Sequence, residues 1–187
     1  MGNSEITRTG ILDAALAEFA AHGVAGARVD RIAAAAGCNK NLIYVYFQSK
    51  ENLFATVLEQ QLPRVYREIP FTPDDLAGYA ARVFDFAMDN PALMRLLAWN
   101  GLEGRAAPQP VRTRARDEKV RELATGTAEA GFAPEFLLTA VMALATAWAE
   151  PSPYGPGLDP DGGTDRDALR ATVHRAVAVL AGAPPAG

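Results

Sequence analysis

The sequence contains few of the residues that build disulfides, metal sites and catalytic centres. It has one cysteine and two histidines in 187 residues. A single cysteine excludes an internal disulfide framework, and the histidines are not paired with other ligands at metal-binding spacing. The chain also has no Gly-x-Ser-x-Gly motif, no phosphate-binding glycine loop and no plausible catalytic triad. These absences argue against an enzyme, and they indicate no metal ion and no cofactor.

Long hydrophobic runs are absent as well. No segment reaches the roughly 18 uncharged residues that a transmembrane helix needs. The richest run, residues 136–149, is shorter and is interrupted by threonines. The N-terminus lacks the basic segment and the apolar run of a signal peptide. We therefore expect a cytoplasmic protein that has no membrane partner.

Hydrophobic residues recur three or four positions apart along most of the chain, and no segment alternates as a strand does. This pattern predicts an all-α protein of about nine helices. Pro63 falls inside the fourth of them, where it removes a backbone donor and clashes with the preceding turn, so we expect a kink or a break there. The predicted helices span residues 7–22, 29–36, 40–47, 49 onwards, 74–88, 91–102, 111–130, 134–149 and 165–181.

Residues 28–50 have the pattern of two short helices joined by a glycine turn. Gly37 can adopt the left-handed conformation that ends a helix. Asn39 can cap the next helix with its side-chain oxygen. That helix, residues 40–47, is too short to be stable alone, so Ile43 and Phe47 must anchor it by packing. A short helix held on one side suits insertion into a DNA groove.

The charge distribution favours the same interpretation. The whole chain has a net charge of −4. Residues 28–50 nevertheless carry four cations and one anion, so a positive face lies on an acidic protein, as binding to phosphates at one end requires. An ordinary solvated helix face can carry the same residue types, and this pattern alone leaves both interpretations open. The charged residues are Arg28, Arg31, Lys40 and Lys50, with Asp30 as the anion.

Three segments, ILDAALAEFAAHG, VDRIAAAAG and NLIYVYFQSKENLF, resemble the DNA-binding domain of TetR/AcrR-like transcriptional regulators. The resemblance covers about residues 8–55 without a gap. It implies a three-helix helix-turn-helix domain at residues 1–50, joined by the fourth helix to a helical effector-binding and dimerisation domain at residues 51–187. It also implies a homodimeric repressor that binds a palindromic double-stranded DNA operator and is released by a small apolar or amphipathic molecule.

Carried over residue by residue, the resemblance implies a set of side chains that read base edges and bind phosphates. Two members depart from the family pattern. Leu42 replaces a small hydroxyl residue, and its methyl groups can contact a thymine methyl. Arg28 replaces the usual Ser or Thr cap, so we expect it to reach the DNA backbone instead. The full DNA-binding set is Arg28, Lys40, Asn41, Leu42, Tyr44, Tyr46 and Lys50.

Two predicted helices, residues 91–102 and 134–149, are apolar nearly all round, and each contains a tryptophan. Such helices are difficult to pack without a cavity or a partner. This favours an effector pocket lined by aromatic and methionine side chains, with simple core packing as the alternative. The candidate pocket residues are Phe84, Met88, Met94, Trp99, Met142 and Trp148.

The helices at residues 134–149 and 165–181 are rich in small residues, which allow helices to approach closely. Two copies of each would form a four-helix bundle across a two-fold axis. The alternative is that both helices only close the core of one subunit. For the whole protein, the competing functions are a helical-bundle carrier or enzyme without DNA binding, and a regulator that answers to a protein partner or to no effector.

Overall fold

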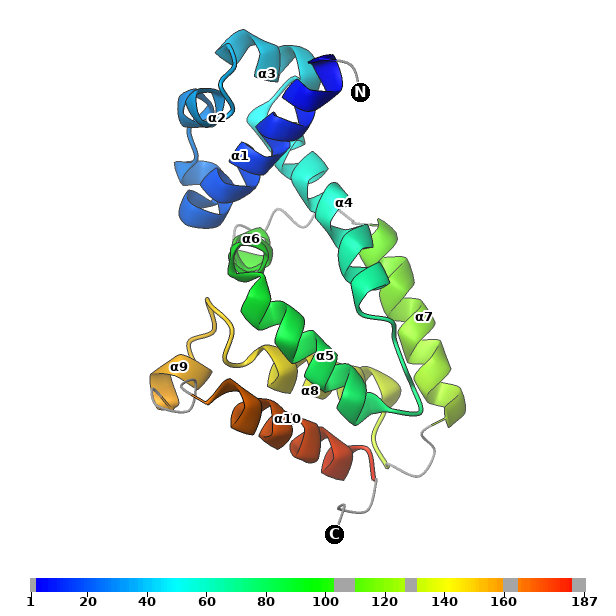
Figure 1. Cartoon of the computed structure of the whole chain (residues 1–187). Helices are drawn as coiled ribbons and strands as arrows, with labels where there is room; N and C mark the ends of the chain where they lie inside the picture. Colours follow the sequence, from blue (N-terminus) through cyan, green and yellow to red (C-terminus); the bar gives the residue numbers. More distant parts are fainter. Residues whose placement is uncertain (1–2, 103–109, 127–130, 160–164, 183–187) are drawn as a thin grey trace. The chain divides into compact units, whose positions relative to one another are not determined.

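The computed structural model describes residues 3–102, 110–126, 131–159 and 165–182. All regular secondary structure in these ranges is helical, which confirms the all-α prediction (Figure 1). The first helices are α1 (Asn3–Gly26), α2 (Val29–Ala35), α3 (Lys40–Phe47), α4 (Lys50–Glu68) and α5 (Leu76–Asp89). They are followed by α6 (Pro91–Leu102), α7 (Pro110–Gly126), α8 (Pro134–Thr146), α9 (Gly155–Leu158) and α10 (Arg166–Leu180).

The chain forms two compact units that do not follow the order of the sequence. The first unit combines residues 1–64 with residues 92–109, and the second combines residues 65–91 with residues 110–187. Helix α6 therefore folds with the N-terminal helices, and the chain passes between the units after residues 64, 91 and 109. These units are defined by contacts and not by function, so the predicted boundary between a DNA-binding domain at residues 1–50 and a second domain at residues 51–187 stays a prediction.

The core of the first unit is built mainly from α1 and α4. Ile11 and Phe19 of α1 and Leu53 and Phe54 of α4 are each at most 4% exposed. The rings of Phe19 and Phe54 meet edge to face, with their centroids 5.2 Å apart. Such an aromatic pair contributes roughly 0.5–1.5 kcal/mol beyond the apolar area that it buries. Helix α2 contacts both α1 and α3, so it connects α3 to the core helix α1.

Two helix interruptions predicted from the sequence have different outcomes. Gly23 has a left-handed φ of 65°, so the backbone of α1 leaves helical geometry at the predicted place before one more turn reaches Gly26. At Pro63 we expected a kink or a break, and the structure excludes the break, because α4 continues through the proline to Glu68. Proline removes only one backbone donor from a helix. The buried side chains Leu58 and Ile69, on either side of it, supply packing that offsets this loss.

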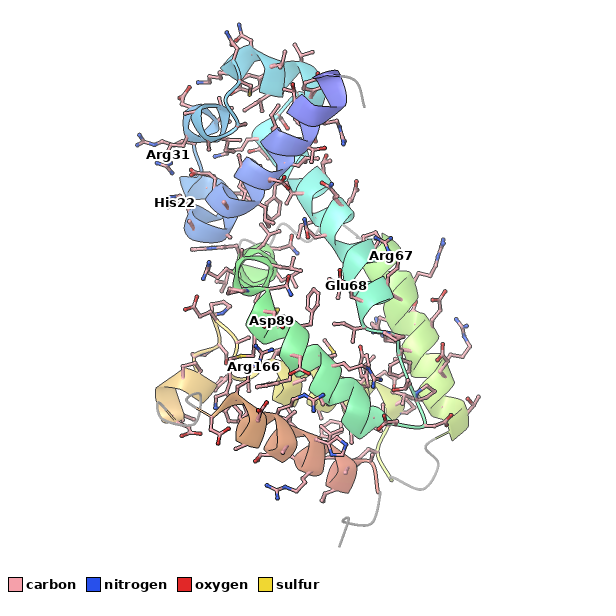
Figure 2. All side chains as sticks on the ribbon, in the orientation of Figure 1. His22, Arg31, Arg67, Glu68, Asp89 and Arg166 are labelled. Carbon is pink, nitrogen blue, oxygen red and sulfur yellow. The ribbon has the colours of Figure 1, made fainter. Side chains whose placement is uncertain are left out.

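The second unit is organised around α5, which packs against α8 and α10, while α7 packs against α8. The side chain of Asp75 caps α5 by accepting a hydrogen bond of 2.7 Å from the backbone N–H of Gly78. Arg166 of α10 donates to Asp89 of α5 at 2.6 Å (Figure 2). The fully buried side chains of this core include Tyr79, Phe84, Leu123, Leu137, Val141 and Val177.

The C-terminal elements differ slightly from the predicted ones. Helix α8 ends at Thr146, three residues before the expected end, and the predicted loop at residues 150–164 contains the short helix α9. Residues 160–164 of that loop lie outside the described ranges. Within those ranges, no helix is long and apolar enough to cross a membrane.

Candidate nucleic-acid interface

Helix α3 is held by the residues that its sequence pattern indicates. Gly37 has a φ of 64°, the left-handed conformation that ends the preceding helix. The Asn39 side chain accepts a hydrogen bond of 2.8 Å from the backbone N–H of Asn41 and so caps α3. Ile43 and Phe47 are 1% and 4% exposed and anchor the helix to the core. These contacts leave the opposite side of α3 open to a partner.

The exposed side of α3 carries the predicted base-reading residues. Lys40, Asn41 and Tyr44 are exposed, whereas Leu42 and Tyr46 are half-buried. The sequence analysis missed Val45, which is 74% exposed on the same helix. The sequence could have indicated this exposure, because Val45 lies between Tyr44 and Tyr46 and does not share the helix face of Ile43 and Phe47. A valine in this position can contact a thymine methyl group.

Lys40 is joined to the preceding helix by an ion pair. Its ammonium lies 2.8 Å from a carboxylate oxygen of Asp30 on α2. This hydrogen bond raises the pKa of Lys40 above its ordinary value. The pair links α2 to α3, and it means that Lys40 already has an anionic partner when no DNA is bound.

Lys50 links the start of α4 to the segment that connects α1 and α2. Its ammonium donates to the backbone oxygen of Ala27 at 3.0 Å and to that of Ala25 at 3.4 Å. An ammonium group has three donors, so one N–H is left for a phosphate. Ser49 caps α4 at the same point, since its hydroxyl accepts a hydrogen bond of 3.0 Å from the backbone N–H of Asn52.

The first turn of α2 has no local side-chain cap, as the presence of Arg28 predicts. Glu18 of α1 supplies the acceptor instead. Its Oε1 accepts hydrogen bonds of 2.8 Å from both the backbone N–H of Arg28 and the Nε of Arg31. The sequence analysis missed Glu18, because it lies ten residues earlier on another helix and no local motif marks it.

The electrostatics of Glu18 reflect this environment. Its side chain is only 10% exposed. Burial raises the pKa of the carboxyl, but the hydrogen bonds from Arg31 and from the Arg28 backbone, with the positive charge of Arg31, outweigh burial and lower it. His22 also approaches, with its Nε2 3.8 Å from Oε2 of Glu18 (Figure 2 labels His22 and Arg31). Glu18 is therefore ionised at neutral pH.

Two further cations on this unit lack a carboxylate partner in the described part of the chain. The side chain of Arg28 is exposed, although its backbone N–H is held by Glu18. Arg8 of α1 is also exposed, and its guanidinium carbon lies 5.5 Å from the centroid of the Phe47 ring. The sequence analysis did not single out Arg8. Both guanidinium groups can bind phosphates without first breaking an ion pair.

The candidate pocket residues fall on both units. Phe84 is fully buried in the core of the second unit, and Met88 and Trp148 pack half-buried against that core. Met142 is 37% exposed. Met94 and Trp99 belong to α6 in the first unit. The pocket therefore stays a prediction.

Trp99 and Trp148 differ in how their indole nitrogens are bonded. Trp99 donates to the backbone oxygen of Ala20 on α1 at 3.3 Å, which joins α6 to α1. The indole nitrogen of Trp148 is buried and has no hydrogen-bond partner among the described residues. A buried donor left unbonded is unfavourable in the free protein.

Two family models match this chain. The model described as bacterial regulatory proteins, tetR family, matches residues 11–57. The model described as tetracyclin repressor-like, C-terminal domain, matches residues 75–178, more than half of the chain. The chain belongs to the TetR family. The first match contains Glu18 and the whole of α2 and α3.

Individual relatives agree with this family. The chain is 38% identical to the HTH-type transcriptional repressor SCO4008 of Streptomyces coelicolor, over 92% of this chain and 96% of the relative. The crystal structure of the regulator SCO4942 from the same species matches with a TM-score of 0.79 and 33% identity, covering 93% of this chain and 97% of that one. The fatty acid degradation regulator FadR of Bacillus halodurans, at 22% identity and a TM-score of 0.60, covers 94% of this chain and 98% of its own and shares the fold.

The family and the geometry of α3 agree on the biochemical role. This protein is a DNA-binding transcriptional regulator, and the predicted helix-turn-helix fold is confirmed. These relatives are transcriptional regulators rather than enzymes.

Proposed function

We propose that this protein is a cytoplasmic homodimeric repressor that binds a palindromic operator and is released by a small apolar or amphipathic molecule. The observation that carries the proposal is the exposed side of α3, which Asn39, Ile43 and Phe47 hold in place from the other side. A dimer presents two such helices, and the two-fold symmetry of a palindrome matches them, with half-site centres about 34–36 Å apart or somewhat more.

We assign the DNA contacts according to exposure and charge. Lys40 and Asn41 begin α3 and read base edges, while Leu42 offers methyl groups to thymine. Tyr44 and Tyr46 contact phosphates or base edges. Lys50 uses its remaining N–H on a phosphate, which the N-terminus of α4 also favours through its backbone dipoles. Arg28 binds a neighbouring phosphate.

For dimerisation we assign the outer faces of α8 and α10, which pack against each other. Phe136 of α8 is 55% exposed and Val179 of α10 is 66% exposed. Phe132 is 43% exposed, and its ring centroid lies 5.4 Å from that of Phe136. Large apolar side chains that are exposed on two helices packed against each other are typical of the surface that a C2 partner covers.

For the response to a ligand we assign the binding site to the second unit. We assign to α6 the role of passing the effect of ligand binding to the DNA-binding helices. Phe84, Met88 and Trp148 supply apolar and aromatic surface there, and the unbonded indole N–H of Trp148 is a donor for a ligand oxygen. Helix α6 follows α5 directly and is hydrogen-bonded through Trp99 to α1. A ligand releases DNA only if it binds the released state more tightly than the DNA-bound state.

The first experiment selects duplexes from random DNA with the full-length protein and measures their binding by fluorescence anisotropy at several salt concentrations. We expect palindromic duplexes whose affinity falls steeply with salt, since bound phosphates release counterions. The proposal fails if no selected duplex binds above a scrambled control.

The second experiment tests the ligand response. Apolar and amphipathic small molecules are screened by thermal shift with the full-length protein, and each stabilising compound is added to the protein–duplex complex. We expect at least one compound to release the duplex. If stabilising compounds leave duplex affinity unchanged, release by a ligand at that site is contradicted; if compounds bind and no duplex does, the protein is a small-molecule carrier.

A further inference from the structure

The start of α2 is stabilised by a side chain from another helix. Every helix begins with backbone N–H groups that have no partner inside the helix. In most helices a Ser, Thr, Asp or Asn at the cap position accepts from one of them. Arg28 occupies that position here and cannot accept a hydrogen bond. Glu18 of α1 meets the backbone N–H of Arg28 itself, at 2.8 Å.

We propose that Glu18 is a positioning residue for DNA binding: its carboxylate fixes α2, and through α2 the recognition helix α3, against α1. The proposal rests on the DNA-binding function. Glu18 does not reach DNA in this role, because its side chain is only 10% exposed and faces Arg28 and Arg31.

Two features explain why α2 needs this contact. With seven residues, α2 is too short to be stable without tertiary contacts. It is also the helix against which α3 packs, on the far side of the turn at Gly37. A displacement of α2 therefore moves the base-reading residues of α3. The Glu18 carboxylate lies at the beginning of this chain of contacts.

The Arg31 side chain makes the arrangement rigid. Its Nε donates to the same Glu18 oxygen that binds the Arg28 N–H. Its Nη2 donates at 3.1 Å to the backbone oxygen of Gly26, at the end of α1. Arg31 is thereby engaged inside the protein, whereas the guanidinium of Arg28 points to no described partner and stays available for a phosphate. The Glu18 carboxylate thus holds the Arg31 side chain inside the protein and leaves the Arg28 side chain for DNA.

The charge of Glu18 allows a clear test, because loss of the charge alone and loss of the positioning contact change DNA affinity in opposite directions. Removing an anion from a DNA-binding surface raises affinity for DNA by simple electrostatics. Loss of a positioning contact lowers it. We therefore compare Glu18→Met, which keeps the length of the side chain without an acceptor, with Asp13→Ala, which removes a carboxylate exposed on the same helix.

The measurement uses the full-length protein and a duplex selected by the wild type, at a temperature well below every melting midpoint. We expect Glu18→Met to bind at least tenfold more weakly than the wild type, and Asp13→Ala to bind equally well or better. Glu18→Gln retains an oxygen that can accept from the Arg28 N–H, and we expect it to bind more tightly than Glu18→Met. If Glu18→Met binds as tightly as Asp13→Ala, the proposal is overturned.

Amide hydrogen exchange tests the contact without DNA. We expect the Arg28 amide to exchange at least tenfold faster in Glu18→Met, with amides of α5 unchanged. Unchanged exchange at Arg28 would overturn this inference alone. If the wild type bound no duplex, the proposed function would fail. The exchange rate of the Arg28 amide would still decide whether Glu18 caps α2.

Discussion

The indole nitrogen of Trp99 donates a hydrogen bond to the backbone oxygen of Ala20 at 3.3 Å and joins α6 to α1. Trp148, the second of the two tryptophans in the chain, has a buried indole nitrogen without such a partner among the described residues. The two residues therefore form a matched pair, one with a satisfied donor and one without.

Substitution of the two tryptophans should have unequal effects on stability. Trp99→Phe loses a hydrogen bond, worth roughly 0.5–1.5 kcal/mol, and leaves the Ala20 oxygen without that donor. Trp148→Phe removes an unbonded donor and loses only packing. We expect urea unfolding, followed by circular dichroism, to find Trp99→Phe the less stable variant by about 1 kcal/mol. A larger loss for Trp148→Phe would mean that the Ala20 contact adds little.

Substitution of the two residues of the Lys40–Asp30 ion pair should change DNA affinity in opposite directions. Lys40→Ala should weaken binding of the selected duplex by about 1–3 kcal/mol, as expected for a lost base contact. Asp30→Asn should strengthen binding, because it removes an anion from the surface and releases Lys40. Fluorescence anisotropy titrations of both variants at one salt concentration check this. Weaker binding by Asp30→Asn would mean that the pair orients Lys40 rather than restrains it.

Lys50 is the cation for which salt dependence is most informative. If its remaining N–H binds a phosphate, Lys50→Ala should reduce the slope of log affinity against log salt by about 1. We expect this reduction together with at least fivefold weaker binding. Arg114→Ala, at an exposed position of α7, is the control and should leave the slope unchanged. A weaker affinity with an unaltered slope would mean that Lys50 binds no phosphate and acts only through its hydrogen bonds to the Ala25 and Ala27 oxygens.

The dimer surface is tested by placing a charge on it. Phe136→Asp puts a carboxylate on a residue that is 55% exposed in the subunit, so the fold should survive while the partner is repelled. We expect light scattering to find monomers and duplex affinity to fall at least tenfold, with the helical circular dichroism retained. Leu102→Asp, at a 78% exposed position of α6, should stay dimeric. A dimeric Phe136→Asp would move the interface elsewhere.

Asp89 and Arg166 predict a pH dependence in the second unit. The hydrogen bond from Arg166 lowers the pKa of Asp89 below its ordinary value. A carboxyl with a lowered folded-state pKa stabilises the protein above its unfolded pKa, and the contribution disappears as the pH falls through the folded value. The melting temperature of Asp89→Asn should therefore be lower than that of the wild type near neutrality, and the two should converge as the pH falls through the lowered pKa of Asp89. Asp74→Asn, an exposed control, should show no such convergence.

The features predicted correctly from the sequence are those that depend on neighbouring residues. Asn39 caps α3 because its side chain reaches an amide two positions later, and Gly37 ends α2 because only glycine adopts that φ without strain. Ile43 and Phe47 anchor α3 because they lie one turn apart. The family resemblance adds the helix-turn-helix domain of a DNA-binding regulator.

The features that were missed depend on contacts between distant residues. Glu18 looks like any polar residue of an amphipathic helix until folding places it beside Arg28. At Pro63 the sequence left both a kink and a break open, and only the structure excludes the break, since α4 continues to Glu68. The pairing of Trp99 with Ala20 spans 79 residues, so no local pattern assigns α6 to the first unit.

The division of the first unit between two lengths of chain limits how its DNA specificity can be transplanted. A chimaera that joins residues 1–64 to the ligand-binding half of another regulator leaves α6 behind, together with the Trp99 bond to α1. The recipient's own sixth helix then has to fit a foreign α1. A graft that carries α6 with the N-terminal helices preserves this contact, at the cost of two further junctions on either side of that helix.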